Sequence, residues 1–292
     1  MKIHRAYYTM FLCLCFNAWA AEFQDSTQIL PFIAESMPLS EWKNFARIGC
    51  GYYPIPEHLK SLLPKTLQLA QSLNSSYEGK PGYSAEKKQQ IETLFLEQKD
   101  WSNYPEETAQ LAKHMAEIGQ SIVRNVLKAL DVDPALHEKI TGGLSCGHGK
   151  NFFKIARYDA AKNLPGFLWH KDIRFVTVLF INQEGLQGRI HNAIFDIKPL
   201  DGYFIINLGA FFEALFNDKT KLSALVHQVQ QVTKDRVSFG AFCEGDFPNK
   251  GFYQLHDGDV TWMQPDDMQA FLLEDKDKAF STSAHTIFSE KH

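Results

Sequence analysis

The chain has 292 residues, with 34 acidic and 30 basic side chains and a formal net charge of -4. This balance gives no electrostatic reason to expect a nucleic-acid partner, so that class of function is excluded at the outset. The five cysteines show no Cys-x-x-Cys spacing, which argues against a zinc site and against a dense disulfide framework. Most of them are predicted to be free, buried thiols.

The N-terminus has the pattern of an export signal. Lys2 and Arg5 precede an apolar run over residues 10–16, and Ala18-Trp19-Ala20 supplies small residues for cleavage. The run is too short to cross a bilayer as a stable helix. Residues 1–20 are therefore predicted to be a signal peptide, and the mature protein to be exported without a membrane span. A cytoplasmic protein with an apolar first element is the alternative, which the odd number of remaining cysteines favours.

The region 21–143 is predicted to be helical or mixed. Ser40 has the chemistry of an N-cap for a short helix that ends at Ala46. A longer helix is expected over residues 56–73, with a kink or a restart at Pro64. The residues that follow, 74–84, are rich in glycine, proline and serine and predict a loop.

The clearest helix is predicted over residues 105–130, where apolar side chains recur at three- and four-residue spacing. Such a stripe predicts core packing and no chemistry. His114 lies on this helix and is interpreted as a surface or packing residue. A further short helix is expected over residues 133–140, where Asp133-Pro134 begins it and two glycines end it.

From residue 144 the apolar period changes toward two, which indicates strands. The strand-like runs cover residues 152–158, 175–181, 203–208 and 237–242. Helices first and strands after them suggest an α+β fold whose C-terminal half is a sandwich or barrel. Residues 144–250 are predicted to form the catalytic core, and residues 251–292 a C-terminal extension that packs on it.

His170 and Asp172 form the first candidate site. In a strand, residues two apart point to the same face, so this pair could chelate a metal. His227, at the end of a later apolar run, is the candidate third ligand. Two imidazoles and one carboxylate form the facial triad that holds non-haem iron(II) and leaves positions open for oxygen.

Arg236 and Ser238 form a second pair with the same alternation. A guanidinium beside a hydroxyl could bind a carboxylate in a buried pocket, and a 2-oxo acid could then fill two open positions on the iron. The alternative is a structural salt bridge of Arg236 with Asp235 or Asp246.

The order and spacing of His170-x-Asp172, His227 and Arg236-x-Ser238 resemble those of the isopenicillin N synthase-like family of iron(II)/2-oxoglutarate dioxygenases. Residues 185–187 and 199–209 are also similar to that family. The resemblance implies a double-stranded β-helix, or jelly roll, with helices packed outside it. It further implies Fe(II), 2-oxoglutarate and O2, a small organic substrate that is hydroxylated or desaturated, and a pocket position for Tyr158 beside Arg236 and Ser238.

Four positions depart from the family pattern. Ile173-Arg174 follows Asp172 where the family usually has a glycine within a residue or two, and Arg174 could narrow or charge the pocket mouth. Asp159 replaces a proline, Ala210 an acidic residue and Gln228 an arginine. None of them is a metal ligand, so these departures bear on the substrate class and on loop geometry.

Two other functions stay open at this point. An oxidase of the same fold would use Arg236 and Ser238 to bind the carboxylate of its own substrate, without 2-oxoglutarate. A non-catalytic binding protein would use the scaffold alone. His148, His191 and Asp196 are interpreted as loop residues rather than ligands.

Overall fold

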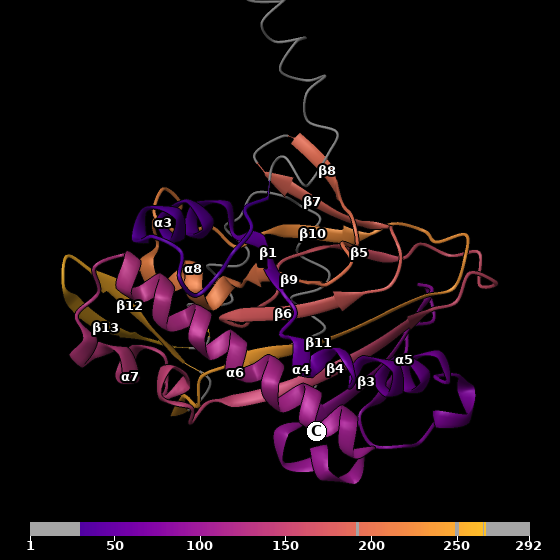
Figure 1. Cartoon of the computed structure of the whole chain (residues 1–292). Coiled ribbons are helices and arrows are strands. Elements are labelled where there is room, and N and C mark those ends of the chain that lie inside the picture. Colours follow the sequence, from indigo (N-terminus) through magenta and orange to yellow (C-terminus); the bar gives the residue numbers. More distant parts are fainter. Residues whose placement is uncertain (1–29, 191–192, 249–250, 265, 267–292) are drawn as a thin grey trace, which may run out of the picture.

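The computed structural model describes residues 30–190, 193–248, 251–264 and residue 266 (Figure 1). The predicted signal peptide, Cys13, Cys15 and His191 lie outside these residues. Within them, every helix is too short or too polar to cross a membrane.

Two antiparallel sheets form the centre of the molecule, as expected for a jelly roll. The larger sheet has seven strands in the order β1 (Cys50–Pro54), β9 (Tyr203–Leu208), β6 (Val176–Ile181), β11 (Arg236–Glu244), β4 (Lys150–Tyr158), β3 (Ile91–Glu97) and β2 (Tyr83–Ala85). The smaller sheet has four strands in the order β5 (Phe167–His170), β10 (Val226–Val229), β7 (Leu186–Ile190) and β8 (Ala193–Ile197).

The alternation of side chains in the large sheet divides the core in two. On β4, Phe153 and Ile155 join the cluster that includes the helices, whereas Ala156 and Tyr158 join the cluster shared with the small sheet. The predicted strands at 152–158, 175–181, 203–208 and 237–242 are confirmed by β4, β6, β9 and β11. One face of these strands is therefore available to form a pocket between the sheets.

The outer face of the large sheet is covered by α6 (Glu106–Ala129), the helix predicted over residues 105–130 (Figure 1). Gly119 allows the closest approach, because a Cβ built at this position would collide with Cys243 Sγ and Val176 on the sheet. His114 is partly exposed, with Nδ1 2.9 Å from Glu117 Oε2 and its ring against that of His58, so its interpretation as a surface or packing residue is confirmed.

The N-terminal helices agree with the prediction in all but their ends. The first, α3 (Leu39–Ile48), has Pro38 as its N-cap, so the expectation of a Ser40 cap was wrong. Pro38 is extended and its carbonyl accepts the first helical hydrogen bonds, which places Ser40 inside the first turn. The predicted restart near Pro64 is confirmed by α4 (Glu57–Lys60) and α5 (Leu63–Gln71).

The short helical segment at residues 133–140 forms where proline and Asx chemistry favour it. The segment at 133–140 consists of a 3-10 turn (Pro134–Leu136) and α7 (His137–Ile140), and Asp133 Oδ1 accepts a hydrogen bond from the Ala135 amide at 2.9 Å. The remaining 3-10 turns are Ser75–Tyr77, Gln98–Asn103 and Leu144–Cys146.

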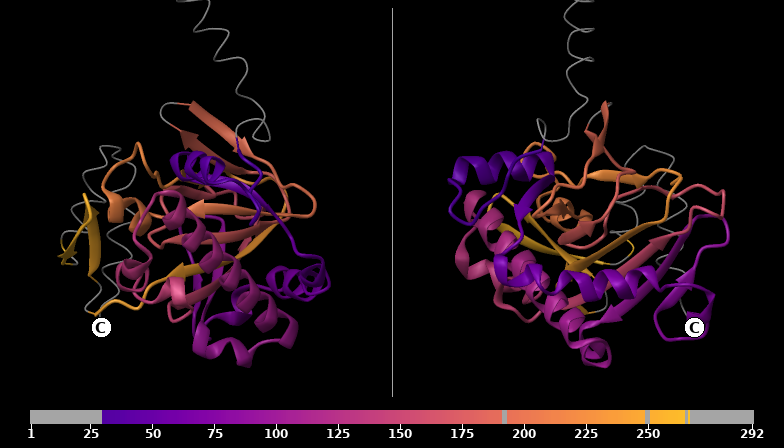
Figure 2. Two further views of the ribbon diagram at one scale, coloured as in Figure 1. Left: turned by 60° about the vertical axis from the view of Figure 1, so that its left-hand side comes forward. Right: turned by 45° about the vertical axis from the view of Figure 1, so that its right-hand side comes forward.

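The C-terminal part that the structure describes packs on α8 (Ala210–Phe216). A hairpin of β12 (Phe252–His256) and β13 (Asp259–Met263) places Phe252 against Phe211 of that helix, with ring centroids 6.4 Å apart. Figure 2 shows the hairpin at the end of the molecule opposite to α5. Strands β1, β2 and β3 come before residue 144 in the chain but belong to the large sheet. A boundary between a helical region and a core at residues 143 and 144 stays a prediction from the sequence.

Candidate metal centre and carboxylate pocket

The three predicted metal ligands meet between the two sheets. His170 on β5 and His227 on β10 lie directly opposite each other in the antiparallel register, and their ring centroids are 4.2 Å apart. Each Nε2 atom lies 3.8 Å from the same oxygen, Asp172 Oδ1. One atom from each residue can be chosen so that all three lie within 4.8 Å of one another, the only such group of three among the described His, Cys, Asp and Glu residues.

Backbone contacts orient both imidazoles. His170 Nδ1 lies 2.8 Å from the Leu168 carbonyl oxygen and His227 Nδ1 lies 3.1 Å from the Leu225 carbonyl oxygen. A carbonyl can only accept, so each Nδ1 carries the proton and each Nε2 lone pair is directed to the centre. This is the tautomer that a metal ligand requires.

Asp172 reaches the centre by a different route from the one predicted. β5 ends at His170, so Asp172 lies beyond the strand and strand alternation does not orient it. Instead, the Thr177 hydroxyl donates a hydrogen bond to Asp172 Oδ2 at 2.7 Å and leaves Oδ1 toward the imidazoles. The Asp172 carbonyl also accepts from the Ala210 amide at 2.7 Å, at the start of α8.

The protonation states suit metal binding. Burial and the neighbouring His227 ring lower the pKa of His170 to about 3. Burial alone would raise the pKa of Asp172, but the two imidazoles and the Thr177 hydroxyl bring it below its usual value. Near neutral pH, His170 is therefore neutral and Asp172 ionised, which are the forms that bind a metal. The donor set fits iron(II).

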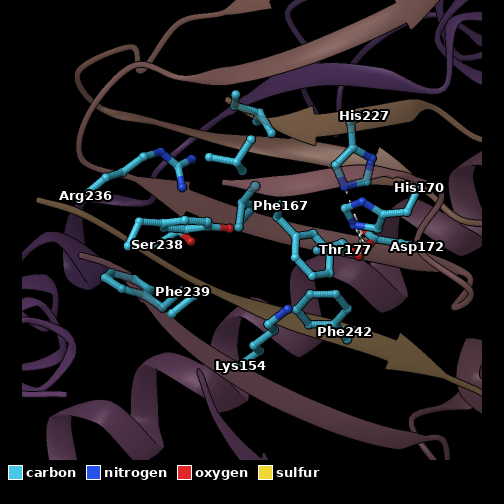
Figure 3. Close-up of a pocket in the computed structure, with 15 residues that line it drawn as sticks. Lys154, Phe167, His170, Asp172, Thr177, His227, Arg236, Ser238, Phe239 and Phe242 are labelled. Atoms are coloured by element: carbon cyan, nitrogen blue, oxygen red, sulfur yellow. Dashed lines mark hydrogen bonds and ion pairs between the residues drawn. The ribbon is translucent and has the colours of Figure 1, made fainter. Parts of the chain in front are cut away.

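Arg236 and Ser238 lie in the same pocket, at the far end from the metal ligands (Figure 3), and Tyr158 also lines this pocket. Arg236 on β11 pairs with Tyr158 on β4, and its guanidinium carbon lies 4.9 Å from the Tyr158 ring centroid. All three side chains are buried, with Arg236 only 1% exposed. Burial lowers the pKa of Arg236 and raises that of Tyr158.

The guanidinium of Arg236 is positioned by a hydrogen bond from one nitrogen, but another of its nitrogens lacks a hydrogen-bond acceptor. Its Nε donates to the Gln183 carbonyl at 3.3 Å, whereas Nη1 is buried and has no hydrogen-bond partner among the described residues. Leaving such a donor without a partner costs free energy. A carboxylate placed between Arg236 and Ser238 would accept this hydrogen bond, so the residues present fit the far carboxylate of 2-oxoglutarate.

The alternative of a structural salt bridge for Arg236 is wrong for the described residues. Asp235 instead pairs with Arg157 at 2.6 Å, and Asp246 pairs with Lys150 at 2.6 Å. The register explains the difference at Asp235, because this residue precedes β11 and lies beside Arg157, which points to the face opposite Tyr158.

The structure shows the contacts of three positions that depart from the family pattern, Arg174, Asp159 and Gln228. Arg174 does not line the pocket, so the expectation that it charges the mouth was wrong; it pairs with Glu244 at 2.6 Å and covers the Phe152 ring. Asp159 has the amide that proline lacks, and donates it to the Gln90 carbonyl at 3.0 Å.

Gln228 and Asp196 belong to one hydrogen-bonded chain of side chains on the small sheet. Gln228 donates to Gln187 at 2.8 Å, and Gln187 donates to Asp196 at 2.8 Å across the small sheet. Asp196 therefore lies on β8 rather than in a loop, as a hydrogen-bond acceptor. His148 is exposed in a loop, as predicted.

Two polar residues of the pocket, Thr177 and Lys154, were not among the predicted site residues. Thr177, the second residue of β6, contacts Asp172, and Lys154 on β4 lines the pocket. Lys154 could have been found by alternation alone, since it stands four residues before Tyr158 on the same strand and so on the same face. Thr177 had no such signal, because its contact depends on the path of a loop.

Comparison with known proteins agrees with this geometry. Residues 139–245 match the model of the 2OG-Fe(II) oxygenase superfamily. The chain is 28% identical over 150 residues to 1-aminocyclopropane-1-carboxylate oxidase homolog 9 of Arabidopsis thaliana, which covers 49% of this chain and 39% of that protein. It is 39% identical over 88 residues to homolog 3 of the same plant, and this match covers 29% of this chain and 23% of that protein. The chain thus spans less than half the length of these relatives.

Solved structures share the fold. The dioxygenase for auxin oxidation from rice has a TM-score of 0.64 at 19% identity, covering 88% of this chain and 99% of that one. A Neurospora crassa protein in complex with alpha-KG and thymine has a TM-score of 0.65 at 15% identity, covering 83% and 96%. The jelly-roll core with packed helices is therefore confirmed.

Proposed function

Because residues 139–245 belong to the 2OG-Fe(II) oxygenase superfamily, we propose that this protein is an iron(II)- and 2-oxoglutarate-dependent dioxygenase. It would hydroxylate or desaturate a small organic substrate. When bound, iron(II) and 2-oxoglutarate supply the oxidising chemistry: for a hydroxylation, O2 gives one oxygen atom to the substrate and one to the succinate that forms as CO2 is lost.

The observation that carries this proposal is the buried Nη1 of Arg236, which lacks an acceptor in the same pocket as His170, Asp172 and His227. We assign the two histidines and Asp172 as the iron ligands, with Thr177 holding the carboxylate of Asp172. Arg236 and Ser238 would bind the far carboxylate of 2-oxoglutarate, and the Tyr158 ring would support the guanidinium.

The apolar side chains that line the pocket would exclude water from it. Leu179, Leu186 and Val229 line the pocket between the two ends. Water exclusion strengthens the interaction of Arg236 with a carboxylate, because the local dielectric is low. It also protects the reacting substrate from solvent.

Arg236→Met tests the assignment. Under anaerobic conditions, wild-type protein with iron(II) and 2-oxoglutarate should show a weak visible metal-to-ligand absorption band. The variant should bind 2-oxoglutarate at least about 30-fold more weakly, since a charge-assisted contact of about 2 kcal/mol is lost. Its metal-free fold should be as stable as wild type or more so, because a buried unsatisfied charge is removed.

The control for this experiment is Arg47→Met, at an exposed position of α3, which should leave the band unchanged. Iron binding to the Arg236 variant is measured separately. A wild-type protein that binds iron but shows no band with 2-oxoglutarate would overturn the proposal.

The oxidase alternative retains support from the relatives that carry 1-aminocyclopropane-1-carboxylate oxidase in their names. In that case Arg236 and Ser238 would bind the substrate's own carboxylate. Oxygen consumption without succinate formation would favour the oxidase. One succinate formed for each O2 consumed would favour the dioxygenase.

We also propose that residues 1–20 direct export. The support is the sequence itself: Lys2 and Arg5 before the apolar run, and Ala18-Trp19-Ala20 after it. N-terminal sequencing of the protein from its native host should begin at Ala21. A protein that keeps Met1 or Lys2 would instead favour a cytoplasmic location.

A further inference from the structure

Lys154 is a second cation in the pocket, and the proposed function gives it no role. On β4 it stands on the same face as Tyr158, and it lies opposite Gly240 of β11 and Phe95 of β3. It lines the same pocket as the three candidate ligands and is labelled with them in Figure 3.

Aromatic rings surround the amine. Lys154 Nζ lies 5.0 Å from the ring centroid of Phe167, 5.2 Å from that of Phe95 and 6.0 Å from that of Phe242. Rings at such distances stabilise a cation but do not replace a hydrogen-bond acceptor. Within the described part of the chain, no hydrogen bond or ion pair involves this amine. Its three N–H donors are therefore available to a ligand.

The amine is also electrostatically costly where it stands. Burial lowers the pKa of Lys154, and the more distant charges of Asp172 and Glu86 only partly oppose this effect. In the proposed complex, the charges of iron(II), Asp172, Arg236 and the 2-oxoglutarate dianion cancel one another. The positive charge of Lys154 is then left without a balancing charge, and one further anionic group would neutralise the pocket.

The position of Lys154 separates it from the clamp formed by Arg236 and Ser238. Tyr158, which pairs with Arg236, is four residues away along β4, or roughly 13 Å at the usual rise of a strand. On the metal side, Phe167 contacts both the amine and the ring of His170, with centroids 4.5 Å apart. The ring of Phe167 therefore connects the amine of Lys154 with His170, one of the candidate metal ligands.

We propose that Lys154 binds the carboxylate of the primary substrate, which is a small organic acid with one anionic group and an apolar or aromatic body. This inference rests on the proposed function. Lys154 would fix one end of the acid, while Phe167 and Phe242, which line the pocket, contact its body and bring it alongside the iron site.

Matched acids and amides test the proposal by binding, without turnover. The probes are 3-phenylpropionate with 3-phenylpropanamide, and hexanoate with hexanamide, titrated calorimetrically into anaerobic protein saturated with iron(II) and 2-oxoglutarate. At least one acid should bind wild type at least tenfold more tightly than its amide. Lys154→Met should abolish this preference without weakening the amide, and Lys154→Arg should largely keep it.

Lys150→Met is the matched control, because Lys150 is on the same strand but pairs with Asp246 outside the pocket. It should keep the full preference for the acid. The proposal is overturned if neither acid binds wild type more tightly than its amide, or if the preference survives Lys154→Met.

The absorption band separates this inference from the proposed function. If Lys154→Met loses the band at saturating 2-oxoglutarate while wild type keeps it, Lys154 serves the cosubstrate and the inference is wrong. If wild type itself forms no band, the proposed function fails. In that case the acids and amides are titrated into wild type and Lys154→Met with iron(II) but without 2-oxoglutarate. The inference about Lys154 then stands if wild type prefers an acid to its amide and the variant does not, and it is overturned otherwise.

Discussion

Lys171 Nζ lies 3.0 Å from Glu213 Oε1, in an ion pair whose side chains are 6% and 1% exposed. Lys171 stands between two of the candidate ligands, and Glu213 belongs to α8. The other oxygen of Glu213 accepts the Ala224 amide at 2.6 Å, three residues before His227. One buried carboxylate therefore ties together the two segments that carry the metal ligands.

Glu213→Gln should weaken both the fold and the metal site. The substitution removes the negative charge from a buried ion pair, and a hydrogen bond to a charged group is worth about 1.5–3 kcal/mol of unfolding free energy. Metal affinity should fall about 10- to 100-fold, as is usual when groups that orient ligands are removed. Urea unfolding of the metal-free protein and a competitive iron(II) titration would measure the two effects.

Two variants serve as controls for Glu213. Glu117→Gln, on the solvent side of α6, should change the unfolding free energy by no more than about 0.5 kcal/mol. The double variant Glu213→Gln, Lys171→Met should recover part of the loss, because both charges are then removed. Full stability of the single variant would contradict this role of Glu213.

Thr177→Val should reduce metal affinity about tenfold while preserving the volume of the side chain. The substitution removes the 2.7 Å hydrogen bond that holds Asp172 Oδ2. Thr177→Ser keeps the hydroxyl and should retain most of the affinity. A competitive iron(II) titration compares all three proteins, and equal affinity of the valine and serine variants would show that the hydrogen bond is dispensable.

Alkylation should distinguish the three described cysteines. Cys146 is exposed, whereas burial raises the pKa of Cys50 and raises that of Cys243 to about 12. The thiolate is the reactive form, so a raised pKa leaves little of it at pH 8. Iodoacetamide should modify Cys146 in the native protein and the other two only after unfolding in urea. Peptide mass spectrometry would detect the sites, and equal labelling of Cys243 and Cys146 would contradict the buried geometry.

The residues of the candidate iron site and of the candidate carboxylate clamp could be predicted from the sequence because they stand in short patterns, His-x-Asp and Arg-x-Ser. His170, Asp172 and His227 meet as expected, although Asp172 is oriented by Thr177 and not by a strand. The contribution of Glu213 could not be predicted, since it depends on where α8 packs against the two ligand segments.

The strands of residues 83–97 were missed for a physical reason. β3 has Glu92 and Thr93 in buried positions, so its sequence lacks a clear alternation of apolar and polar residues. Glu92 is tolerated there because Lys162 pairs with it. Short strands such as β5 and β10 have four residues each, which is too few to show a period.

The absence of a side chain at Gly119 affects the pocket on the other side of the large sheet. The helix that carries Gly119 contacts Cys243, whose neighbour Phe242 faces the amine of Lys154 on the other side of the same strand. A larger side chain at Gly119 would push β11 inward and move Phe242, although the helix itself never borders the cavity. The shape of the pocket thus depends partly on how closely α6 can approach the opposite face of the large sheet.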